Sequence, residues 1–375
     1  MYEPFPTNYT WSTSANLALG CGGEIGEVDE VVRALQPYAA TGDAEAWEAA
    51  WRRMAERVAG LARRDEAAGH RLSAGGKYLR AAAYRFVGER QVPPRSPSKL
   101  EGYREFLADF NRGVALSGVP LERVEVPFEG TSMPALFLPA QASGPAPAMI
   151  YVDGFDICKE IMWLVLRDAF ARRGVHCLFV DTPGVGEMLR LRGVPTRYDY
   201  EVPVAACVDY LQGRADVLAD RIGVMGISLG GYYAPRAAAF EPRLRCCVAW
   251  GAIWDYGATW ERRRHLRPDS PVSVPAFQLA WVMGAEGFEA ALEKARAFTL
   301  AEVMPRIRCP LLIVHGAEDR QIPLADAERA FQAATGTAVK ELKVFTAAEG
   351  GTQHCQLDNR SLAIDYITDW VADHL

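Results

Sequence analysis

The pattern of hydrophobic and polar positions changes near residue 121. From about residue 24 to residue 113, apolar residues recur at three- and four-residue spacing and no strand-like run interrupts them. That spacing is typical of amphipathic helices. After residue 121, short β-branched runs alternate with helical stretches. We therefore predict a helical N-terminal domain over residues 1–120 and a second domain of strands and helices over residues 121–375.

One helix of the N-terminal domain can be placed closely. The segment DAEAWEAAWRRMAERVAGLARRDEAAG carries a single apolar stripe made of Trp47, Trp51, Met54, Val58 and Leu61. Asp43 is a candidate N-cap for this helix and Gly69 a candidate stop. The segments KYLRAAAYRFVGER and KLEGYREFLADFNRG predict two more helices, which the Pro-rich break VPPRSPS separates.

The second domain contains a series of short apolar runs. RVEVPFE and MPALFLP predict an antiparallel pair of strands. AMIYVDG, VHCLFVD, RIGVMGIS, RCCVAWG and PLLIVHG are continuous apolar runs that Gly, Asp or Ser closes. Such runs indicate parallel strands buried on both faces, hence an α/β fold. Between about residues 254 and 305 the alternation gives way to a Trp- and Arg-rich segment, which predicts a helical insertion after the sixth strand, over one edge of the sheet.

Composition and charge exclude several classes of function. The net charge of −6 and a pI near 5.7 argue against a nucleic-acid partner, because phosphate binding requires clustered Lys and Arg. No apolar run approaches the roughly 20 residues of a membrane span, and the N-terminal segment lacks the pattern of a signal peptide. The eight cysteines form no CxxC pair and no metal-ligand spacing. We expect a reduced, cytoplasmic protein with no metal and no cofactor.

The segment VMGISLGGYY, residues 224–233, contains the strongest candidate for catalysis. Ser228 directly follows a predicted strand and precedes the predicted helix LGGYYAPRAAAF. Gly226 and Gly230 allow a tight strand-to-helix turn that would raise the serine side chain above the sheet. The backbone N–H of Leu229, at the start of the helix, could then stabilise an oxyanion. The alternative is a structural glycine-rich bend that happens to contain a serine.

A nucleophilic serine needs a base, and the base needs an acid that orients it. Asp319 lies in a loop after the predicted strand PLLIVHG, and His354 lies in the Gly-rich loop TAAEGGTQHCQLDN before the last helix. The order Ser228, Asp319, His354 is the chain order of the nucleophile-elbow hydrolases. His315 is a competing base, but it ends a strand, where a neutral packed histidine is commoner. Glu318 is the competing acid.

The second oxyanion donor is expected from the loop after the third strand of the domain, YVDGFDICKE. The backbone N–H of Phe155 is the candidate, with Gly154 allowing a close approach. Asp153 and Asp156 flank it, and either helix capping or substrate binding would explain them. The turn VDTPGVGE follows the next strand and is expected to shape the pocket. Its glycines do not complete the GxGxxG fingerprint of a dinucleotide site.

Four motifs, DGFDICKE, DTPGVGE, GISLGGYYAPRAA and EGGTQHC, together resemble α/β-hydrolases with a helical N-terminal lid. That family includes 2,6-dihydroxypseudooxynicotine hydrolase and the fungal polyketide-shortening hydrolases of naphthopyrone and melanin biosynthesis. GGEIGEVDEVV and AAGHRLSAGGKYLRAAAYRF are similar to its lid helices, so the resemblance covers nearly the whole chain. It implies a mostly parallel eight-stranded sheet, a homodimer, and a triad of Ser228, Asp319 and His354.

The resemblance also implies a reaction in which a bond between an acyl carbon and a carbon leaving group is hydrolysed. An additional acid is implied for protonating the leaving carbon, and GAIWDYGATWE offers Asp255 and Glu261. We expect Asp156, Trp254, Asp255 and Tyr256 to contact a small-molecule substrate. An aromatic cavity and core packing are alternative explanations of Trp163, Trp250, Trp254, Tyr256, Trp260 and Trp281. A carboxylesterase or thioesterase with the same triad is the second hypothesis, and a non-catalytic binding module is the third.

Overall fold

The computed structural model describes residues 1–265 and 270–375, which fold into two compact units. The first unit comprises residues 1–120 together with the described part of the segment 266–278. The second comprises residues 121–265 and 279–375. The predicted change at residue 121 therefore coincides with a boundary between units. Residues 270–278, which the sequence analysis places in the predicted insertion, group by their contacts with the helical unit.

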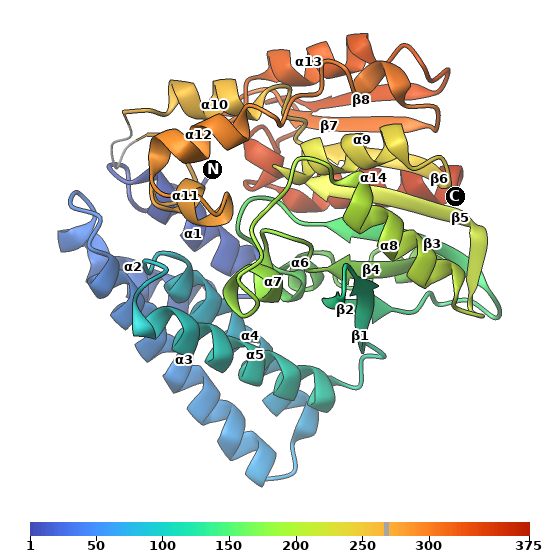
Figure 1. Ribbon diagram of the computed structural model, residues 1–375. Helices are drawn as coiled ribbons and strands as arrows, with labels where there is room; N and C mark the ends of the chain where they lie inside the picture. Colours follow the sequence, from blue (N-terminus) through green and yellow to red (C-terminus); the bar gives the residue numbers. More distant parts are fainter. Residues whose placement is uncertain (266–269) are drawn as a thin grey trace. The chain divides into compact units, whose positions relative to one another are not determined.

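The helical unit begins with five α-helices and a 3₁₀ turn (Figure 1). They are α1 (Tyr9–Gly20), α2 (Ile25–Leu35), η1 (Gln36–Tyr38), α3 (Ala44–Ala67), α4 (Arg71–Arg90) and α5 (Pro97–Ser117). The predicted cap of α3 is confirmed, because the Asp43 carboxylate accepts the backbone N–H groups of Glu45 and Ala46. The sequence did not predict α1, since its buried positions include Ser, Thr and Asn and leave no apolar stripe.

Aromatic side chains form the core of the helical unit. The Trp47 ring lies 4.7 Å from that of Trp11 and 5.6 Å from that of Trp51, measured between centroids. Trp51 in turn contacts Tyr84 on α4 at 5.5 Å. The Tyr84 hydroxyl donates to Glu27 of α2 and accepts from the backbone N–H of Glu24. The apolar stripe of α3 therefore packs against α1 and α4, and one polar contact fixes the start of α2.

Among the described residues of the second unit, eight strands form one sheet in the order β1-β2-β4-β3-β5-β6-β7-β8. The strands are β1 (Glu122–Phe128), β2 (Thr131–Leu138), β3 (Ala146–Val152), β4 (His176–Val180), β5 (Val217–Ile227), β6 (Leu244–Trp250), β7 (Leu311–Gly316) and β8 (Lys340–Phe345). β2 runs antiparallel to β1 and β4, and all the other neighbours are parallel. Val152 of β3 pairs with both Val180 and Gly226, so these strands end at the same edge.

Helices cover both faces of this sheet (Figure 1). The helices after β3 are α6 (Lys159–Leu166), α7 (Gly186–Arg190), α8 (Glu201–Gln212), α9 (Gly230–Phe240), α10 (Tyr256–Arg262), α11 (Gln278–Val282), α12 (Phe288–Ala295), α13 (Leu324–Ala333) and α14 (Arg360–His374), with 3₁₀ turns η2 (Ala171–Arg173), η3 (Met304–Arg306) and η4 (His354–Gln356). Of these, α6, α7, α8, α9, α13 and α14 contact strands of the sheet. α10, α11 and α12 lie within the segment that the sequence analysis predicts to be a helical insertion, of which residues 266–269 lie outside the described residues. Within the described residues, none of the helices has the length and apolarity that crossing a bilayer requires.

The eighth strand has a different pattern from the others. Its sequence, KELKVF, alternates charged and apolar residues, and all but its last residue are half-buried. An edge strand of this kind needs no continuous apolar run, and its lysines protect the open edge. For that reason the apolar runs alone did not reveal it.

Candidate active site

Ser228 occupies the turn between β5 and α9. Its φ angle is 56°, in the left-handed region that residues with a side chain seldom adopt. The Ser228 backbone N–H donates to the carbonyl of Trp250 at the end of β6, at 2.8 Å. Strained backbone of this kind is common at functional sites, where the surrounding structure holds it in place. The predicted strand–turn–helix setting of Ser228 is present.

Gly226 makes this turn possible. A Cβ atom at residue 226 would lie 2.2 Å from the carbonyl oxygen of Gly230. No side chain fits in that space, since the obstructing atom belongs to the backbone. The glycine two residues before Ser228 therefore lets the start of α9 fold back against the end of β5.

The structure brings Ser228, His354 and Asp319 together from three separate loops. Ser228 Oγ lies 2.8 Å from His354 Nε2, and His354 Nδ1 lies 2.7 Å from Asp319 Oδ2. The other carboxylate oxygen, Asp319 Oδ1, accepts the backbone N–H groups of Gln321 and Ile322 at 2.8 and 3.0 Å. The carboxylate is thus fixed on one side, and its second oxygen is directed at the imidazole.

Charge and burial reinforce this arrangement. The side chains of Asp319 and His354 are 1% and 9% exposed. Burial alone would lower the pKa of His354, but the adjacent Asp319 carboxylate outweighs it and raises that pKa. Burial would likewise raise the pKa of Asp319, and the imidazole reverses this and lowers it. The pair therefore favours a charged carboxylate that stabilises the imidazolium formed when His354 takes a proton.

The loop that carries His354 is also strained. Cys355 and Gln356 have φ angles of 49° and 48°. The Gln356 side chain crosses to β6, where its Oε1 accepts the indole N–H of Trp250 at 2.5 Å. Trp250 thus holds both the Ser228 turn, through its carbonyl, and the His354 loop, through its side chain.

The two competing residues have other contacts. His315 Nε2 lies 3.0 Å from the carbonyl oxygen of Ile322 and 3.5 Å from Asp319 Oδ2. Burial lowers the pKa of His315, which favours the neutral form. Glu318 Oε2 accepts the hydroxyl of Thr352 at 3.0 Å. Neither residue replaces His354 or Asp319 in the chain of contacts that begins at Ser228.

The two predicted oxyanion donors flank the serine. Leu229 follows Ser228 at the start of α9 and is buried. Phe155 belongs to the loop after β3, whose Gly154 lies so close to the turn that a Cβ there would be 3.0 Å from Ser228 Cβ. The loop after β3 and the nucleophile turn are therefore in contact. That the N–H groups of Leu229 and Phe155 form an oxyanion hole stays a prediction.

The predicted substrate-binding residues are occupied by contacts within the protein. Asp156 is fully buried, and its Oδ1 lies 2.7 Å from Arg190 Nη1. Asp255 Oδ1 caps α10 by accepting the backbone N–H of Ala258. Tyr256 is 2% exposed and packs against rings that include Phe155, 6.0 Å away between centroids. These contacts explain Asp156, Asp255 and Tyr256 by packing and capping, and contact with substrate stays a prediction for them.

Trp254 and Glu261 complete the set of predicted pocket residues. Trp254 is half-buried, and its backbone N–H donates to Asp326 on α13. Glu261 pairs with Arg264 at 2.8 Å on the surface. The ion pair with Arg264 explains Glu261 without substrate, and its role as the additional acid stays a prediction.

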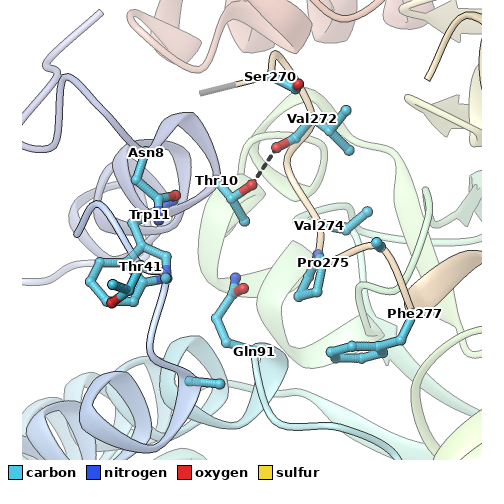
Figure 2. A pocket seen from close by; sticks show the side chains of 13 residues that line it. Asn8, Thr10, Trp11, Thr41, Gln91, Ser270, Val272, Val274, Pro275 and Phe277 are labelled. Atoms are coloured by element: carbon cyan, nitrogen blue, oxygen red, sulfur yellow. Dashed lines mark hydrogen bonds between the residues drawn. The ribbon is translucent and has the colours of Figure 1, made fainter. Parts of the chain in front are cut away.

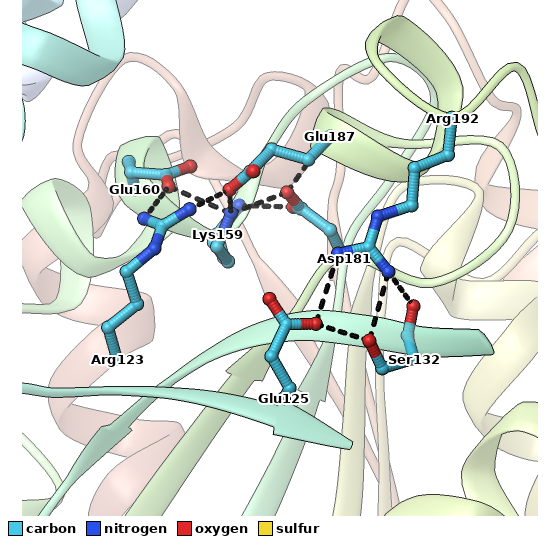
Figure 3. Close-up of polar contacts among 8 residues, drawn as sticks. All are labelled: Arg123, Glu125, Ser132, Lys159, Glu160, Asp181, Glu187 and Arg192. Atoms are coloured by element: carbon cyan, nitrogen blue, oxygen red, sulfur yellow. Dashed lines mark hydrogen bonds and ion pairs between the residues drawn. The ribbon is translucent and has the colours of Figure 1, made fainter. Parts of the chain in front are cut away.

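Sequence reasoning missed a buried ion network at the same edge of the sheet, which Figure 3 shows. Lys159 Nζ lies 2.7 Å from Asp181 Oδ2, 2.6 Å from Glu187 Oε1 and 2.8 Å from Glu160 Oε1. Arg123 on β1 also contacts Glu160 and Glu187. Lys159 and Glu160 lie within DGFDICKE, and Asp181 and Glu187 lie within VDTPGVGE, whereas Arg123 belongs to RVEVPFE. Nothing in these separate segments indicated that their charges meet.

A cavity of about 270 Å³ lies within the helical unit (Figure 2). Trp11, Gln91, Pro275 and Phe277 are among its lining residues. Thr10 bridges two sides of it by donating to the carbonyl of Val272 at 2.7 Å. None of the triad residues lines this cavity. Over residues 1–265 and 270–375, no group of three or more His, Cys, Asp and Glu side chains is arranged to hold a metal ion.

Comparison with known proteins places the chain in a family. The prolyl oligopeptidase family matches residues 170–375. The 2,6-dihydropseudooxynicotine hydrolase of Paenarthrobacter nicotinovorans is 31% identical over 74% of this chain and 72% of its own length. The α/β hydrolase gkaG of Penicillium citrinum is 28% identical over 83% of this chain and 82% of its own length.

A solved structure extends this similarity to nearly the whole chain. The crystal structure of a 2,6-dihydroxy-pseudo-oxynicotine hydrolase matches with a TM-score of 0.79 and 26% identity, covering 96% of this chain and 95% of that protein. The eight-stranded mixed sheet and the N-terminal helices are thus shared with that enzyme. The chain is therefore a hydrolase of the α/β-hydrolase family, related to 2,6-dihydroxypseudooxynicotine hydrolase and to fungal hydrolases of secondary metabolism.

Proposed function

We propose that this protein is a serine hydrolase that cleaves a carbon–carbon bond beside a carbonyl in an aromatic ketone or a polyketide-like 1,3-dicarbonyl. The unbroken series of contacts from Ser228 through His354 to Asp319 carries the proposal of serine chemistry. The likeness to an enzyme named for a pseudooxynicotine, over almost the entire chain, supports the choice of substrate class.

The first half of the reaction forms an acyl-enzyme. His354 Nε2 takes the hydroxyl proton of Ser228 as Oγ attacks the ketone carbon, and Asp319 stabilises the resulting imidazolium. The carbonyl π electrons move to oxygen, where the N–H groups of Leu229 and Phe155 stabilise the negative charge. The re-forming carbonyl then breaks the carbon–carbon bond, and its electron pair leaves with the carbon fragment.

The leaving carbon must be able to accept that electron pair. A neighbouring carbonyl or an electron-rich ring delocalises it as an enolate or its equivalent, so the substrate itself supplies part of the activation. His354 returns its proton to this carbon and releases a neutral ketone or arene. Water then attacks the acyl-enzyme with His354 as the base, which releases a carboxylic acid and restores Ser228.

Carboxylester or thioester hydrolysis is the second candidate, because it uses the same three residues with a better leaving group. Matched substrates separate the two: a 1,3-diketone and an ester that carry the same acyl group and the same aryl substituent. We expect turnover of the diketone to equal parts of carboxylic acid and methyl ketone. Turnover of the ester with an intact diketone would overturn the carbon–carbon proposal and leave the esterase.

The control is Ser228→Ala, which removes the nucleophile with a small change of volume at a half-buried position. We expect the variant to keep the wild-type melting temperature and to lose turnover of both substrates. Undiminished turnover of either substrate in Ser228→Ala would show that the serine does not act as the nucleophile.

A further inference from the structure

The loop after β3, residues 153–158, is held closely at its N-terminal end. A Cβ atom at Gly154 would lie 2.7 Å from the carbonyl oxygen of Ile227, so the loop backbone lies directly on the nucleophile turn. Phe155, whose N–H is a proposed oxyanion donor, follows immediately. A small rotation of the loop would therefore redirect this N–H relative to Ser228 Oγ.

The other end of the loop depends on a buried charge. Asp156 has a φ angle of 56°, a strained conformation for a residue with a side chain. Its carboxylate forms an ion pair with Arg190, the last residue of α7, at 2.7 Å, and both side chains are fully buried. The backbone N–H of Gly186, at the start of α7, donates to the carbonyl of Ile157 at 3.0 Å. The loop therefore contacts both ends of α7, through a hydrogen bond at Gly186 and an ion pair at Arg190.

Arg190 also contacts the insertion. Its guanidinium carbon lies 5.3 Å from the ring centroid of Trp281 on α11, within the range of a cation–π contact. The carbonyl of Val282, the last residue of α11, accepts the backbone N–H of Thr196 at 2.8 Å, in the segment that follows α7. Arg190 therefore connects the loop after β3, α7 and α11 through one buried side chain.

We propose that Arg190 is a positioning residue, which aims the backbone N–H of Phe155 at the reacting oxygen through its ion pair with Asp156, and that Trp281 fixes the guanidinium. This proposal rests on the serine mechanism proposed above. A planar guanidinium with several fixed donors suits such a role better than a flexible ammonium group. The contribution should be made in the transition state, where the oxyanion is fully charged, and so should affect kcat more than KM.

The test uses p-nitrophenyl acetate, whose hydrolysis needs the oxyanion donors whatever bond the natural substrate contains. We expect Arg190→Gln to lower kcat on the order of 10-fold to 100-fold, less than the roughly 100-fold to 1000-fold loss that follows complete removal of an oxyanion donor, with little change in KM. Arg190→Lys should recover only part of the rate. The matched control is Arg192→Gln, two residues along, whose side chain pairs with Glu125 in contact with solvent (Figure 3).

The double variant Asp156→Asn/Arg190→Gln separates positioning from stability. Each single variant removes one partner of the buried ion pair and keeps the charge of the other, whereas the double variant removes both charges, so its melting temperature should return toward the wild-type value. We expect its kcat to stay low. Recovery of kcat together with the melting temperature, or a wild-type kcat in Arg190→Gln, would overturn the proposal. A wild-type enzyme that hydrolyses neither the ester nor the diketone would instead contradict the serine mechanism itself.

Discussion

Two segments meet at the edge of the sheet, and they are held in place by different physical means. The nucleophile turn is fixed locally: Ser228 adopts its left-handed conformation because Gly226 leaves no side chain in the way and the Trp250 carbonyl accepts its N–H. The loop after β3 is fixed from a distance, by Arg190 and by the network around Lys159. The first depends on steric fit and backbone hydrogen bonds, and the second depends on buried charge.

This difference separates what each segment tolerates. Steric constraints cannot be relieved by pH or by a second substitution far away. The cost of breaking a buried ion pair can be relieved in these ways. Removing one partner leaves a costly unpaired charge, whereas removing both partners can be nearly neutral for stability. Variants in the two segments should therefore differ in pH dependence and in whether a second change rescues them.

The largest effect is expected at Asp319. In Asp319→Asn the imidazole loses the carboxylate that orients it, and kcat should fall about 10⁴-fold. Because Asp319 raises the pKa of His354, its removal lowers that pKa, and the acid limb of the kcat/KM profile should move to lower pH. The control is Glu318→Gln at the neighbouring acid. A rate loss in Asp319→Asn without a shift of the acid limb would contradict the pairing of Asp319 with His354.

The nucleophile turn is tested by Gly226→Ala. The added methyl group would collide with the Gly230 carbonyl, so the turn must open. We expect a loss of several kcal/mol in the free energy of unfolding, in the range of strained core substitutions, together with loss of activity. Urea unfolding measures the first and ester hydrolysis the second. A fully active and stable variant would show that the close approach of β5 and α9 is unnecessary.

The buried ion network is tested by Lys159→Met. This change leaves the Asp181, Glu160 and Glu187 carboxylates without their shared ammonium partner, and we expect the free energy of unfolding to fall by about 3–5 kcal/mol. Lowering the pH should narrow the difference in the free energy of unfolding between wild type and Lys159→Met, because protonation neutralises the carboxylates that have lost the ammonium group. A difference that does not change between pH 8 and pH 5 would argue against an electrostatic origin.

A smaller, stabilising effect is expected at Asp153. Burial and the nearby Asp181 and Glu160 carboxylates raise the pKa of Asp153 well above its usual value, so the folded protein holds it neutral while the unfolded chain ionises it. That contribution to the free energy of unfolding is present at low pH and is lost as the pH rises toward the folded-state pKa. Asp153→Asn should therefore gain stability over wild type between pH 4 and pH 7 in thermal unfolding. A stability advantage of Asp153→Asn that shrinks as the pH rises from 4 to 7 would contradict a raised pKa of Asp153 in the folded protein.

The same contrast explains what could be predicted from the sequence. The nucleophile turn and Asp319 follow from local pattern, because a continuous apolar strand closed by Gly, Ser or Asp identifies the carboxyl edge of a parallel sheet. His354 was identified from its Gly-rich loop before the last helix and from its place after Asp319 in the chain. The partnership of Asp156 with Arg190 depends on two loops meeting in space, and nothing in their local sequence indicates it. β8 was obscured by its alternating charges, and α1 by its buried polar residues. The grouping of residues 270–278 with the N-terminal helices depends on contacts with residues far away in the chain, such as Thr10, which local sequence does not indicate.

The central claim is that Ser228 forms a covalent bond to the acyl carbon of a ketone. Rapid acid quenching of the enzyme during turnover of the 1,3-diketone, followed by peptide mass spectrometry, tests it directly. If Ser228 is the nucleophile, the peptide that contains it gains the mass of the acyl group, and the ketone is released before the acid. Diketone cleavage with no acyl group on Ser228 at any quench time, under conditions that trap the acyl-enzyme from the matched ester, would contradict it.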